Sequence, residues 1–586
     1  MDISKIQSPA DIKQLDLDGL KDIAGQIRNA ILNRTSKIGG HVSPNLGDVE
    51  AVIALHYVFD APKDKIVFDV SHQDFAHKIL TGRAYGYMDP KDFAKVGEYT
   101  DPKESPKYDL FYAGHTSPSI SLCTGLIKAR ELTGEKYNIV AFIGDGSLSG
   151  GEAFEGLDAA GELKKNLIVV VNDNQMSIAE DHGGMYESLR LLRETDGTSE
   201  RNIFKDFGFQ YIYVADGNDL DSLIKAFRSA KDTEVPVVVH INTQKGKGYK
   251  PAEEFREEFH QPDPFRVENG QPLKQTNAPN AGLMLRDWLL KKCKEEPRLL
   301  IVASATPESY GFYSKQREEA GKHYIDVGIA EQTAVSVMAG AAKGGAKVVY
   351  PVPVTFVQRA FDQLIEDWAM DDSPALLIAL KSGLTGETDL THLGFWDVPM
   401  FSLMPNIVYL APTNIQEFFA MLEWGVRQDK YKVVVRMPTY SFVNATGPVD
   451  ADYSELNKFK IVHSGKTVAV VAAGDYFAKG QKVCDLLKAQ GIDATLINPR
   501  FVSGVDKEMI VNLKKDHDLL VTIEDNSVEG GFGQKVATVA AEIGLRTKVF
   551  GLQKKFVDRY VPLNLEKEEG LLPEQITEQI LKLLKK

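Results

Sequence analysis

Residues 138–179 read NIVAFIGDGSLSGGEAFEGLDAAGELKKNLIVVVNDNQMSIA, and this stretch decides the fold class. An apolar run from Ile139 to Ile143 ends in a Gly-Asp-Gly turn, which is followed by the small residues of an expected helix. A second apolar run, Leu167 to Val171, ends in Asn-Asp-Asn. Two buried strands joined by a helix form a parallel βαβ unit, so we expect an α/β protein.

Both predicted strand ends carry short oxygen-bearing side chains, Asp145 on the first and Asn174 on the second. Parallel sheets bind ligands beyond the carboxyl ends of their strands. A Gly-x-Gly turn before a helix lets backbone N–H groups approach a diphosphate, but a carboxylate in that turn repels the ligand unless a cation lies between them. We therefore predict that Mg²⁺ bridges Asp145, Asn174 and a diphosphate. A structural turn or a degenerate dinucleotide-binding loop is the plainer alternative.

The composition limits the class of protein and its partners. A chain of 586 residues and 64.8 kDa exceeds what one hydrophobic core serves, so several domains are expected. The net charge of −14 argues against nucleic acid or an acidic membrane surface as the main partner. Cys123, Cys293 and Cys484 lie far apart and predict neither a disulfide framework nor a zinc site. With no signal-like or membrane-spanning apolar run found, we expect a cytoplasmic protein.

Strand and helix patterns predict three domains, each a mostly parallel sheet flanked by helices. A polar, proline-marked linker is expected between the first two. The predicted ranges are 1–250 for the first domain, 251–280 for the linker, 281–450 for the second domain and 451–586 for the third.

Three polar segments lie outside the expected strands and helices. Residues 181–202 are expected to be irregular, and the plainer alternative for the basic residues 244–249 is a solvated turn. In the third domain, Ile523–Asn526 is interpreted as turn chemistry or an interface.

Five histidines divide into two groups. His41, His72 and His115 each follow a glycine or a serine at a break in the chain pattern, where neutral imidazoles can bind phosphate oxygens or transfer protons. His77 and His240 are expected to be satisfied structural residues. In the second domain, Glu331 opens a helix of small residues, and taken alone it is a carboxylate that complements the helix dipole.

Motifs along almost the whole chain carry a resemblance to a known family. They are Gly40-His41, residues 69–83 (DVSHQDFAHKILTGR), residues 114–117 (GHTS), the GDG and NDN pair, Gly248-Tyr249, Ala330-Glu331-Gln332, residues 355–363 (TFVQRAFDQ) and Thr391-His392. Together they resemble 1-deoxy-D-xylulose-5-phosphate synthase, a transketolase-like enzyme that uses thiamine diphosphate. Transketolase and the first component of pyruvate dehydrogenase share these motifs only in part.

The resemblance implies a role for each matching residue. Asp145 and Asn174 match the Mg²⁺ ligands, and Glu331 matches the carboxylate that hydrogen-bonds the aminopyrimidine of the cofactor. The other implied cofactor contacts are His72, Gly114, His115, Thr116, Gly146, Ser147, Asn174, Tyr249 and Phe356. Histidines that face the thiazolium carbon and the substrates are His41, His260 and His392. Arg359, Lys381 and Arg436 match contacts to substrate carboxylate or phosphate.

Three positions depart from the family pattern and concern the acceptor. Pro353 stands where a Tyr is usual, Lys381 where an Arg is usual, and Thr388 where an Asp is usual, with Asp389 beside it. The resemblance implies a homodimer that decarboxylates pyruvate and adds the two-carbon unit to D-glyceraldehyde 3-phosphate, in isoprenoid and thiamine precursor synthesis. Transketolase-like ketol transfer, or a synthase for another aldehyde, stays open, as does a catalytically dead cofactor-binding protein.

Overall fold

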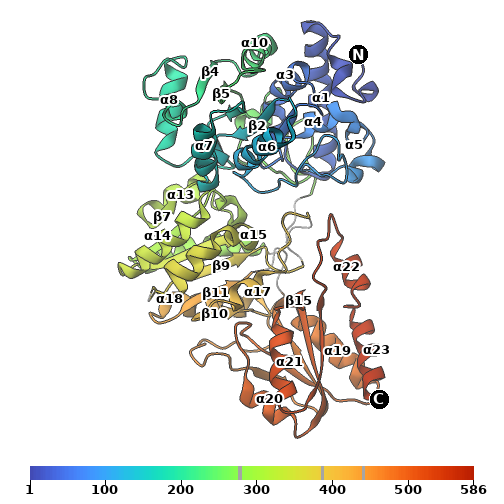
Figure 1. Ribbon diagram of the computed structural model, residues 1–586. Helices are drawn as coiled ribbons and strands as arrows, with labels where there is room; N and C mark the ends of the chain where they lie inside the picture. The colour runs from blue at the N-terminus through green and yellow to red at the C-terminus, as the bar shows by residue number, and fades with distance from the viewer. Residues whose placement is uncertain (275–279, 372, 385–388, 438–442, 586) are drawn as a thin grey trace. The chain divides into compact units, whose positions relative to one another are not determined.

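The computed structural model describes residues 1–274, 280–371, 373–384, 389–437 and 443–585. The chain forms two compact units. Residues 1–277 and 327–330 make up the first unit, and residues 278–326 and 331–586 make up the second. The described residues form three sheets, one in the first unit and two in the second (Figure 1).

The sheet of the first unit is parallel throughout, in the strand order β1-β2-β3-β5-β4. Its strands are β1 (Lys65–Phe68), β2 (Ile139–Gly144), β3 (Ile168–Asp173), β4 (Gln210–Val214) and β5 (Val237–Asn242). The predicted βαβ unit is therefore observed, with α7 (Gly151–Leu163) as its helix. Since β2 and β3 are neighbours, the Gly-Asp-Gly and Asn-Asp-Asn ends lie at the same edge.

Helices cover both faces of this sheet, which explains why its strands are continuous apolar runs. Val140 and Phe142 face a core shared with α1 (Leu17–Ile38), α3 (Val49–Val58) and α10 (Leu220–Ala230). Ala141 and Ile143, on the opposite face, pack with α6 (Ser119–Thr133) and α7 (Figure 1). The shorter helices are η1 (Ile3–Lys5), η2 (Pro9–Ile12), α2 (Ser43–Gly47), α4 (Phe75–Lys78), η3 (Ile79–Arg83), α5 (Tyr85–Met88), η4 (Pro90–Lys95), η5 (Gly146–Ser149), α9 (Ile203–Asp206) and α11 (Lys250–Glu254).

The expectation of irregular structure over residues 181–202 is wrong, because helix α8 (Met185–Glu194) lies within this range. Leu189 and Leu192 are buried on one side of the helix, while charged residues occupy the other. The high share of charge concealed this apolar stripe.

The predicted linker begins with α11, and its Phe259 and Phe265 belong to the core of the first unit. Residues 275–279 lie outside the described part of the chain. The domain boundaries given above remain predictions.

The larger sheet of the second unit is also parallel, in the order β10-β11-β9-β8-β6-β7. Its strands are β6 (Leu299–Ala303), β7 (Tyr324–Asp326), β8 (Lys347–Pro353), β9 (Leu376–Leu380), β10 (Ile407–Leu410) and β11 (Lys432–Arg436). One face packs on α12 (Ala281–Glu295) and α18 (Ile415–Arg427), and α14 (Glu331–Lys343) contacts β6 and β8. The other helices here are η6 (Pro307–Tyr310), α13 (Ser314–Ala320), η7 (Gly321–His323), α15 (Val354–Val357), η8 (Gln358–Ala360), α16 (Phe361–Gln363), η9 (Leu364–Ala369) and α17 (Asp397–Ser402).

The third sheet, β12-β14-β13-β15-β16, is mixed because β12 runs antiparallel to β14. Its strands are β12 (Lys460–His463), β13 (Thr467–Ala472), β14 (Thr495–Asn498), β15 (His517–Ser527) and β16 (Arg546–Leu552). The accompanying helices are η10 (Gly474–Tyr476), α19 (Phe477–Ala489), α20 (Lys507–Leu513), α21 (Phe532–Glu542), α22 (Pro562–Glu568) and α23 (Pro573–Leu584). Glu524, Asp525 and Asn526 lie inside β15, so the interpretation of this tripeptide as a turn is wrong.

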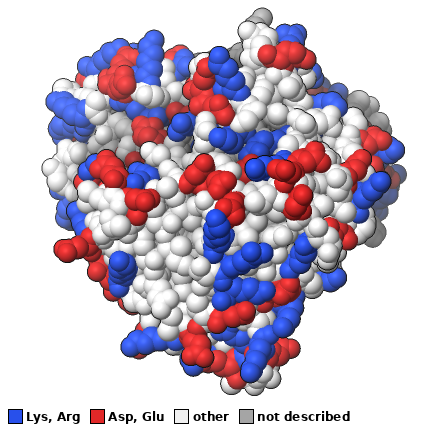
Figure 2. All heavy atoms as spheres, turned by 90° about the horizontal axis from the view of Figure 1, so that it is seen from above, with Lys and Arg blue, Asp and Glu red and all other residues white. Residues whose placement is uncertain are grey.

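Acidic and basic side chains are interspersed over the face drawn in Figure 2, with no broad region of one sign. No helix among the described residues is long and apolar enough to cross a membrane.

Candidate active site

Asp145 is fixed by backbone N–H groups at the ends of β2 and β3. Its carboxylate accepts hydrogen bonds from the N–H of Gly146 (3.1 Å), Asn174 (3.0 Å) and Gln175 (2.6 Å). The side chain is 1% exposed. The two motifs that the sequence singled out therefore meet through this carboxylate.

Gly146 is needed because the chain after β3 passes directly against it. A Cβ atom at Gly146 would lie 2.7 Å from Cβ of Ser177 and 2.9 Å from its Cα, closer than side chains tolerate. Ser147, the next residue, is buried, and its carbonyl accepts a hydrogen bond from Oγ of Ser117 (2.9 Å). Gly146 and Ser147 thus close the turn against two other segments of the first unit.

Oxygen atoms without hydrogen bonds surround this turn. Oδ1 of Asn174 and both carboxylate oxygens of Asp181 are buried and have no hydrogen-bond partner among the described residues. Burial, followed by the nearby negative charge of Asp181, raises the pKa of Asp145 well above its ordinary value. Burial raises the pKa of Asp181 to about 7. Carboxylate and amide oxygens are the donors that Mg²⁺ prefers, so these residues fit a hard divalent cation.

Residues 245–248 form a turn, as the plainer reading of this basic segment has it, but Lys245 is not solvated. The side chain is 1% exposed, and its Nζ donates to the carbonyls of Ser177 and Ile178. Burial lowers the pKa of Lys245 to about 8, against the charges of Asp145 and Asp181. This places a cation beside the two carboxylates, where an anionic ligand can be held.

The Gly114-His115-Thr116 turn lies at the same sheet edge because Asp69 anchors it. Asp69 follows β1, and its buried carboxylate accepts the N–H of Ser117 (2.7 Å) and of Ser119 (3.0 Å). Because β1 pairs with β2, the anchored turn is a neighbour of the Asp145 turn.

His41, His72 and His260 form a cluster. Their ring centroids are 4.7 Å apart for His41 and His72, 5.4 Å for His41 and His260, and 5.2 Å for His72 and His260. Asn45 holds the first two in place by donating to the carbonyls of His41 (2.9 Å) and His72 (2.6 Å). Burial lowers the pKa of His260 well below its ordinary value, which keeps this ring neutral.

Glu98 orients His41. Its Oε2 lies 2.7 Å from Nδ1 of His41, so the proton is assigned to Nδ1 and a lone pair to Nε2. Gly40 makes room for this contact, since a Cβ there would lie 2.3 Å from Oε1 of Glu98.

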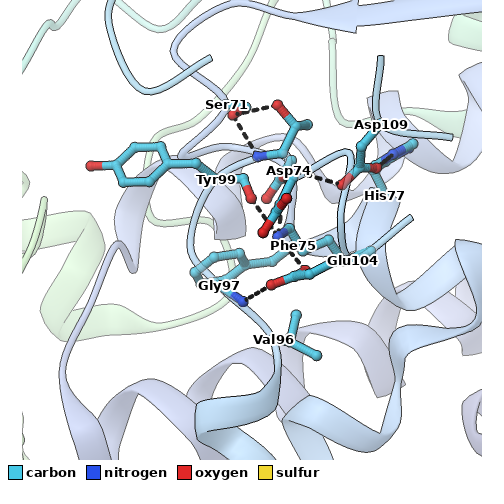
Figure 3. Close-up of polar contacts among 12 residues, drawn as sticks. Ser71, Asp74, Phe75, His77, Val96, Gly97, Tyr99, Glu104 and Asp109 are labelled. Carbon is cyan, nitrogen blue, oxygen red and sulfur yellow. Dashed lines mark hydrogen bonds and ion pairs between the residues drawn. The ribbon is translucent and has the colours of Figure 1, made fainter. Parts of the chain in front are cut away.

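A buried charge network holds the segment that carries Glu98 (Figure 3). Lys78 donates to the carbonyl of Tyr99 and to Glu104 (3.1 Å), which accepts the N–H of Gly97. Thr100 in turn donates its N–H to Oγ of Ser71 (2.8 Å), the residue before His72. The network therefore fixes the segment around Glu98 relative to the chain around His72.

The two histidines expected to be structural have satisfied, buried rings. His77 bonds Asp109 (3.0 Å) and His56 (2.9 Å), and His240 bonds Asp173 (2.8 Å). Tyr249, expected at the cofactor, has its ring against Phe259 and Phe265 and its hydroxyl on the carbonyl of Val267 (2.9 Å). Tyr249 therefore contacts Phe259, the residue before His260.

In the second unit, Glu331 is a buried carboxylate at the start of α14. It is 3% exposed, and its Oε2 has no hydrogen-bond partner among the described residues, with Nη1 of Arg359 3.5 Å away. Burial raises the pKa of Glu331, and the charge of Arg359 opposes this. A helix-capping role needs no such burial, so the arrangement favours an acceptor held for a ligand.

Phe356 and His392 are in edge-to-face contact, with ring centroids 5.5 Å apart. Asp389 accepts from the N–H (2.9 Å) and Oγ1 (2.6 Å) of Thr391, and its Oδ1 lies 3.7 Å from Nδ1 of His392. Asp389 therefore orients the loop that carries His392. Thr388 lies outside the described residues. Pro353 ends β8 and directly precedes α15.

Arg436 is already paired. Its Nε bonds Asp397 (2.7 Å), its Nη1 bonds Asp525, and the side chain is 5% exposed. Arg436 ends β11 opposite Ala379 of β9, and Lys381 follows two residues later, so the strand register brings these two cations to one edge. The guanidinium group of Arg436 is therefore already bonded to two carboxylates of the protein.

Sequence reasoning missed four residues that complete these clusters: Asp181, Glu98, Asp397 and Asp525. None of them belongs to a motif that the sequence analysis assigned to cofactor or substrate binding. Only the fold brings them to a partner far away in sequence. Asp181, seven residues beyond Asn174, is the one that a local search around the Asn-Asp-Asn motif could have found.

Three family profiles match the chain. The profile described as 1-deoxy-D-xylulose-5-phosphate synthase matches residues 3–202 and 192–243. Those described as the pyrimidine binding domain and the C-terminal domain of transketolase match residues 278–442 and 457–576.

Curated relatives cover nearly the full length. The 1-deoxy-D-xylulose-5-phosphate synthase of Pelotomaculum thermopropionicum is 35% identical over 99% of this chain and 96% of its own. The synthase of Symbiobacterium thermophilum is 35% identical over 100% of this chain and 95% of its own. The synthase of Thermomicrobium roseum is 35% identical over 100% of this chain and 98% of its own.

The two parallel sheets, the third mixed sheet and the matched pyrimidine-binding domain define a transketolase-like enzyme that uses thiamine diphosphate. The full-length identities go further. The chain belongs to the 1-deoxy-D-xylulose-5-phosphate synthase family, which confirms the predicted fold class and the resemblance.

Proposed function

We propose that the protein decarboxylates pyruvate and joins the remaining two-carbon unit to D-glyceraldehyde 3-phosphate. The products are 1-deoxy-D-xylulose 5-phosphate, a precursor for isoprenoids and thiamine, and carbon dioxide. The main support for this proposal is that the chain matches members of the synthase family over its full length. The buried Asp145 turn and the buried carboxylate of Glu331 agree with it. When bound, thiamine diphosphate supplies an acidic thiazolium carbon and an electron sink for decarboxylation.

Residues of the first unit would bind the cofactor. Asp145 and Asn174 would hold Mg²⁺, with Asp181 as a further acidic donor, and Lys245 would offset the diphosphate charge. His72, the Gly114-His115-Thr116 turn and the Gly146-Ser147 turn would surround the diphosphate. The support is that all of these lie at one edge of the first sheet.

Proton handling is assigned to a carboxylate and to imidazoles. Glu331 would accept a hydrogen bond from the aminopyrimidine, against which Phe356 would pack, since its Oε2 has no other hydrogen-bond partner among the described residues. His41 would take up a proton at Nε2, because Glu98 keeps the other proton on Nδ1. His260 and His392 would act on the substrates, and Arg359 and Lys381 would bind their anionic groups.

One observation favours a second candidate, a related synthase with another aldehyde acceptor. Arg436, which the resemblance assigns to the acceptor phosphate, is already bonded to Asp397 and Asp525. Lys381 offers a single ammonium charge rather than the paired N–H donors of an arginine. Recognition of a phosphate would then be weaker than in a site with two available arginines.

A substrate panel tests both candidates. Purified protein with Mg²⁺ and thiamine diphosphate is given pyruvate and, in separate reactions, D-glyceraldehyde 3-phosphate, D-glyceraldehyde and glycolaldehyde. Carbon dioxide is measured and the products are identified by mass. The proposal expects carbon dioxide release and 1-deoxy-D-xylulose 5-phosphate as the preferred product. Equal rates with unphosphorylated aldehydes favour the second candidate, and transfer from ketose phosphates without carbon dioxide replaces both with ketol transfer.

We propose also that the protein is a cytoplasmic homodimer, which the family implies and its three free cysteines suit. Sedimentation velocity should give twice the 64.8 kDa of one chain. A single species of one-chain mass contradicts the dimer.

A further inference from the structure

Three imidazoles of the first unit converge closely enough to share one ion. One nitrogen from each of His41, His72 and His260 lies within 4.8 Å of the others. Zinc binds imidazole nitrogen at about 2.0–2.1 Å, so side-chain movements of about 1 Å bring the three atoms onto a common centre. Among the residues that the structure describes, this is the one group of at least three His, Cys, Asp or Glu side chains found with possible metal-ligand atoms this close together.

Two of the three imidazoles in the cluster are buried. His41 is 4% exposed and His260 is 8% exposed. Nδ1 of His260 is buried without a hydrogen-bond partner in the described part of the chain, an arrangement that costs free energy unless a ligand satisfies the atom. Neutral imidazole is the form that binds metals, and burial lowers the pKa of His260, which favours that form for this ring.

Glu98 supplies the outer contact that metal-binding histidines usually have. Its carboxylate accepts the Nδ1 proton of His41, at 2.7 Å, and leaves the lone pair on Nε2. Carboxylate–histidine pairs of this kind fix the tautomer and raise the basicity of the ligating nitrogen. The segment that carries Glu98 is itself held by the Lys78–Glu104 network (Figure 3).

We propose that His41, His72 and His260 bind one divalent transition-metal ion of the zinc class, and that this ion inhibits the enzyme. Three imidazoles select such ions over Mg²⁺, which prefers oxygen, so the site differs chemically from the Asp145 site. Inhibition follows because nitrogens engaged by the metal no longer accept protons. Only this inhibitory consequence rests on the proposed function.

Cobalt titration tests binding without any measurement of turnover. Metal-free, full-length protein without thiamine diphosphate is titrated with Co²⁺ in excess Mg²⁺, the visible absorption of bound Co²⁺ is followed, and Zn²⁺ is added as competitor. One equivalent of Co²⁺ is expected, displaced by one equivalent of Zn²⁺. His260→Gln should weaken binding by roughly 100-fold, because a ligand is lost. Glu98→Gln should weaken it about 10-fold, because only the outer contact is lost.

Two control variants separate this site from others. Asp145→Asn removes the oxygen site and should leave the Co²⁺ spectrum unchanged. His463→Gln removes a half-exposed histidine paired with Asp493 and should also change nothing. Circular dichroism checks the fold of every variant, and if His260→Gln does not fold, the partly exposed Glu98→Gln decides.

The outcomes are separable from those of the proposed function. No Co²⁺ signal in the wild-type protein, or the same affinity in Glu98→Gln or in folded His260→Gln, overturns the inference even if pyruvate is turned over. Binding as described without carbon dioxide release from pyruvate supports the site and overturns the function. In an active holoenzyme, Zn²⁺ should lower turnover and a zinc-selective chelator should restore it. Turnover unchanged at saturating Zn²⁺ overturns the inhibitory part.

Discussion

Glu331 has surroundings that a role in helix stability does not require. A carboxylate that only complements a helix dipole is normally solvated, whereas Glu331 is 3% exposed. Glu152 provides the comparison, because it also lies in the first turn of a helix, α7, but is exposed. The difference between the two is therefore burial rather than position in the helix.

Glu331→Gln is expected to keep the fold and cofactor binding but lower kcat by roughly 100-fold or more, since the carboxylate proposed to accept a hydrogen bond from the aminopyrimidine is lost. Turnover and thermal unfolding are measured together. Glu152→Gln is the matched control and should leave kcat unchanged. If Glu331 acts only on the helix dipole, its variant should lose about 0.5–1 kcal/mol of stability and keep its turnover.

Asp145→Asn is expected to abolish the Mg²⁺-dependent binding of thiamine diphosphate, because the anionic ligand between two strand ends is removed. Asp181→Asn should weaken Mg²⁺ binding less, about 10-fold, as the more peripheral of the two carboxylates. Isothermal titration calorimetry measures both. Asp158→Asn, on the exposed side of α7, should bind normally. Binding by Asp145→Asn at wild-type affinity, or in excess chelator, argues against the metal bridge.

At the scale of elements, the strands could be predicted because a strand covered on both faces must be a continuous apolar run. β2 and β3 are such runs, and polar residues follow them at the carboxyl edge of the sheet. The position of Asp145 and Asn174 at this edge could thus be predicted from local sequence. α8 was missed because its apolar stripe is narrow, and Asp525 because its burial in β15 depends on Arg436, 89 residues away. Pairing across such separations is a property of the fold, not of the local pattern.

The junction of β11 and β15 depends on Arg436. Replacing it with Met leaves Asp397 and Asp525 buried without their cation, and removal of one partner from a buried pair costs about 3–5 kcal/mol. Arg436→Met should therefore lower the unfolding midpoint in urea markedly. Arg427→Met, at an exposed arginine of α18, should change stability by no more than about 0.5 kcal/mol.

Lys381 gives a cleaner test of phosphate recognition than Arg436. Lys381→Met should raise KM for a phosphorylated aldehyde about 10-fold, the loss of one charged contact, and leave KM for its unphosphorylated analogue and pyruvate decarboxylation nearly unchanged. Equal effects on both aldehydes remove Lys381 from the phosphate site.

Glu524 makes the stability of the third sheet pH-dependent. Its carboxylate accepts the N–H of Phe532 (2.9 Å) and Gly533 (2.8 Å) at the start of α21, yet burial raises its pKa to about 8 from the ordinary 4.5. The folded state then holds this proton more tightly than the unfolded state, so this contribution to stability falls as pH rises from 4.5 to about 8. Glu524→Gln should show a smaller fall in unfolding temperature over this range. The same fall in both proteins contradicts this assignment.

At the scale of the whole molecule, two compact units and three sheets imply that unfolding is not a single all-or-none step. A bound ligand raises the stability of the folded unit that binds it. The proposed function uses Asp145 of the first unit and Glu331 of the second. It assigns Asp145 to the affinity for the cofactor and Glu331 to catalysis. Calorimetry can separate these tasks.

Mg²⁺ and thiamine diphosphate together are expected to raise the temperature of at least one unfolding transition. A ligand at 100 times its Kd adds about 2.7 kcal/mol to the stability of the state that binds it. Differential scanning calorimetry should find the full shift only with both ligands, because the cation compensates the charge between Asp145 and the diphosphate. Asp145→Asn should lose the shift, while Glu331→Gln should keep most of it, since its carboxylate is assigned to a hydrogen bond with the aminopyrimidine and not to the diphosphate. A shift that is independent of Mg²⁺, or that survives in Asp145→Asn, would mean that the diphosphate is held without a metal at the ends of β2 and β3.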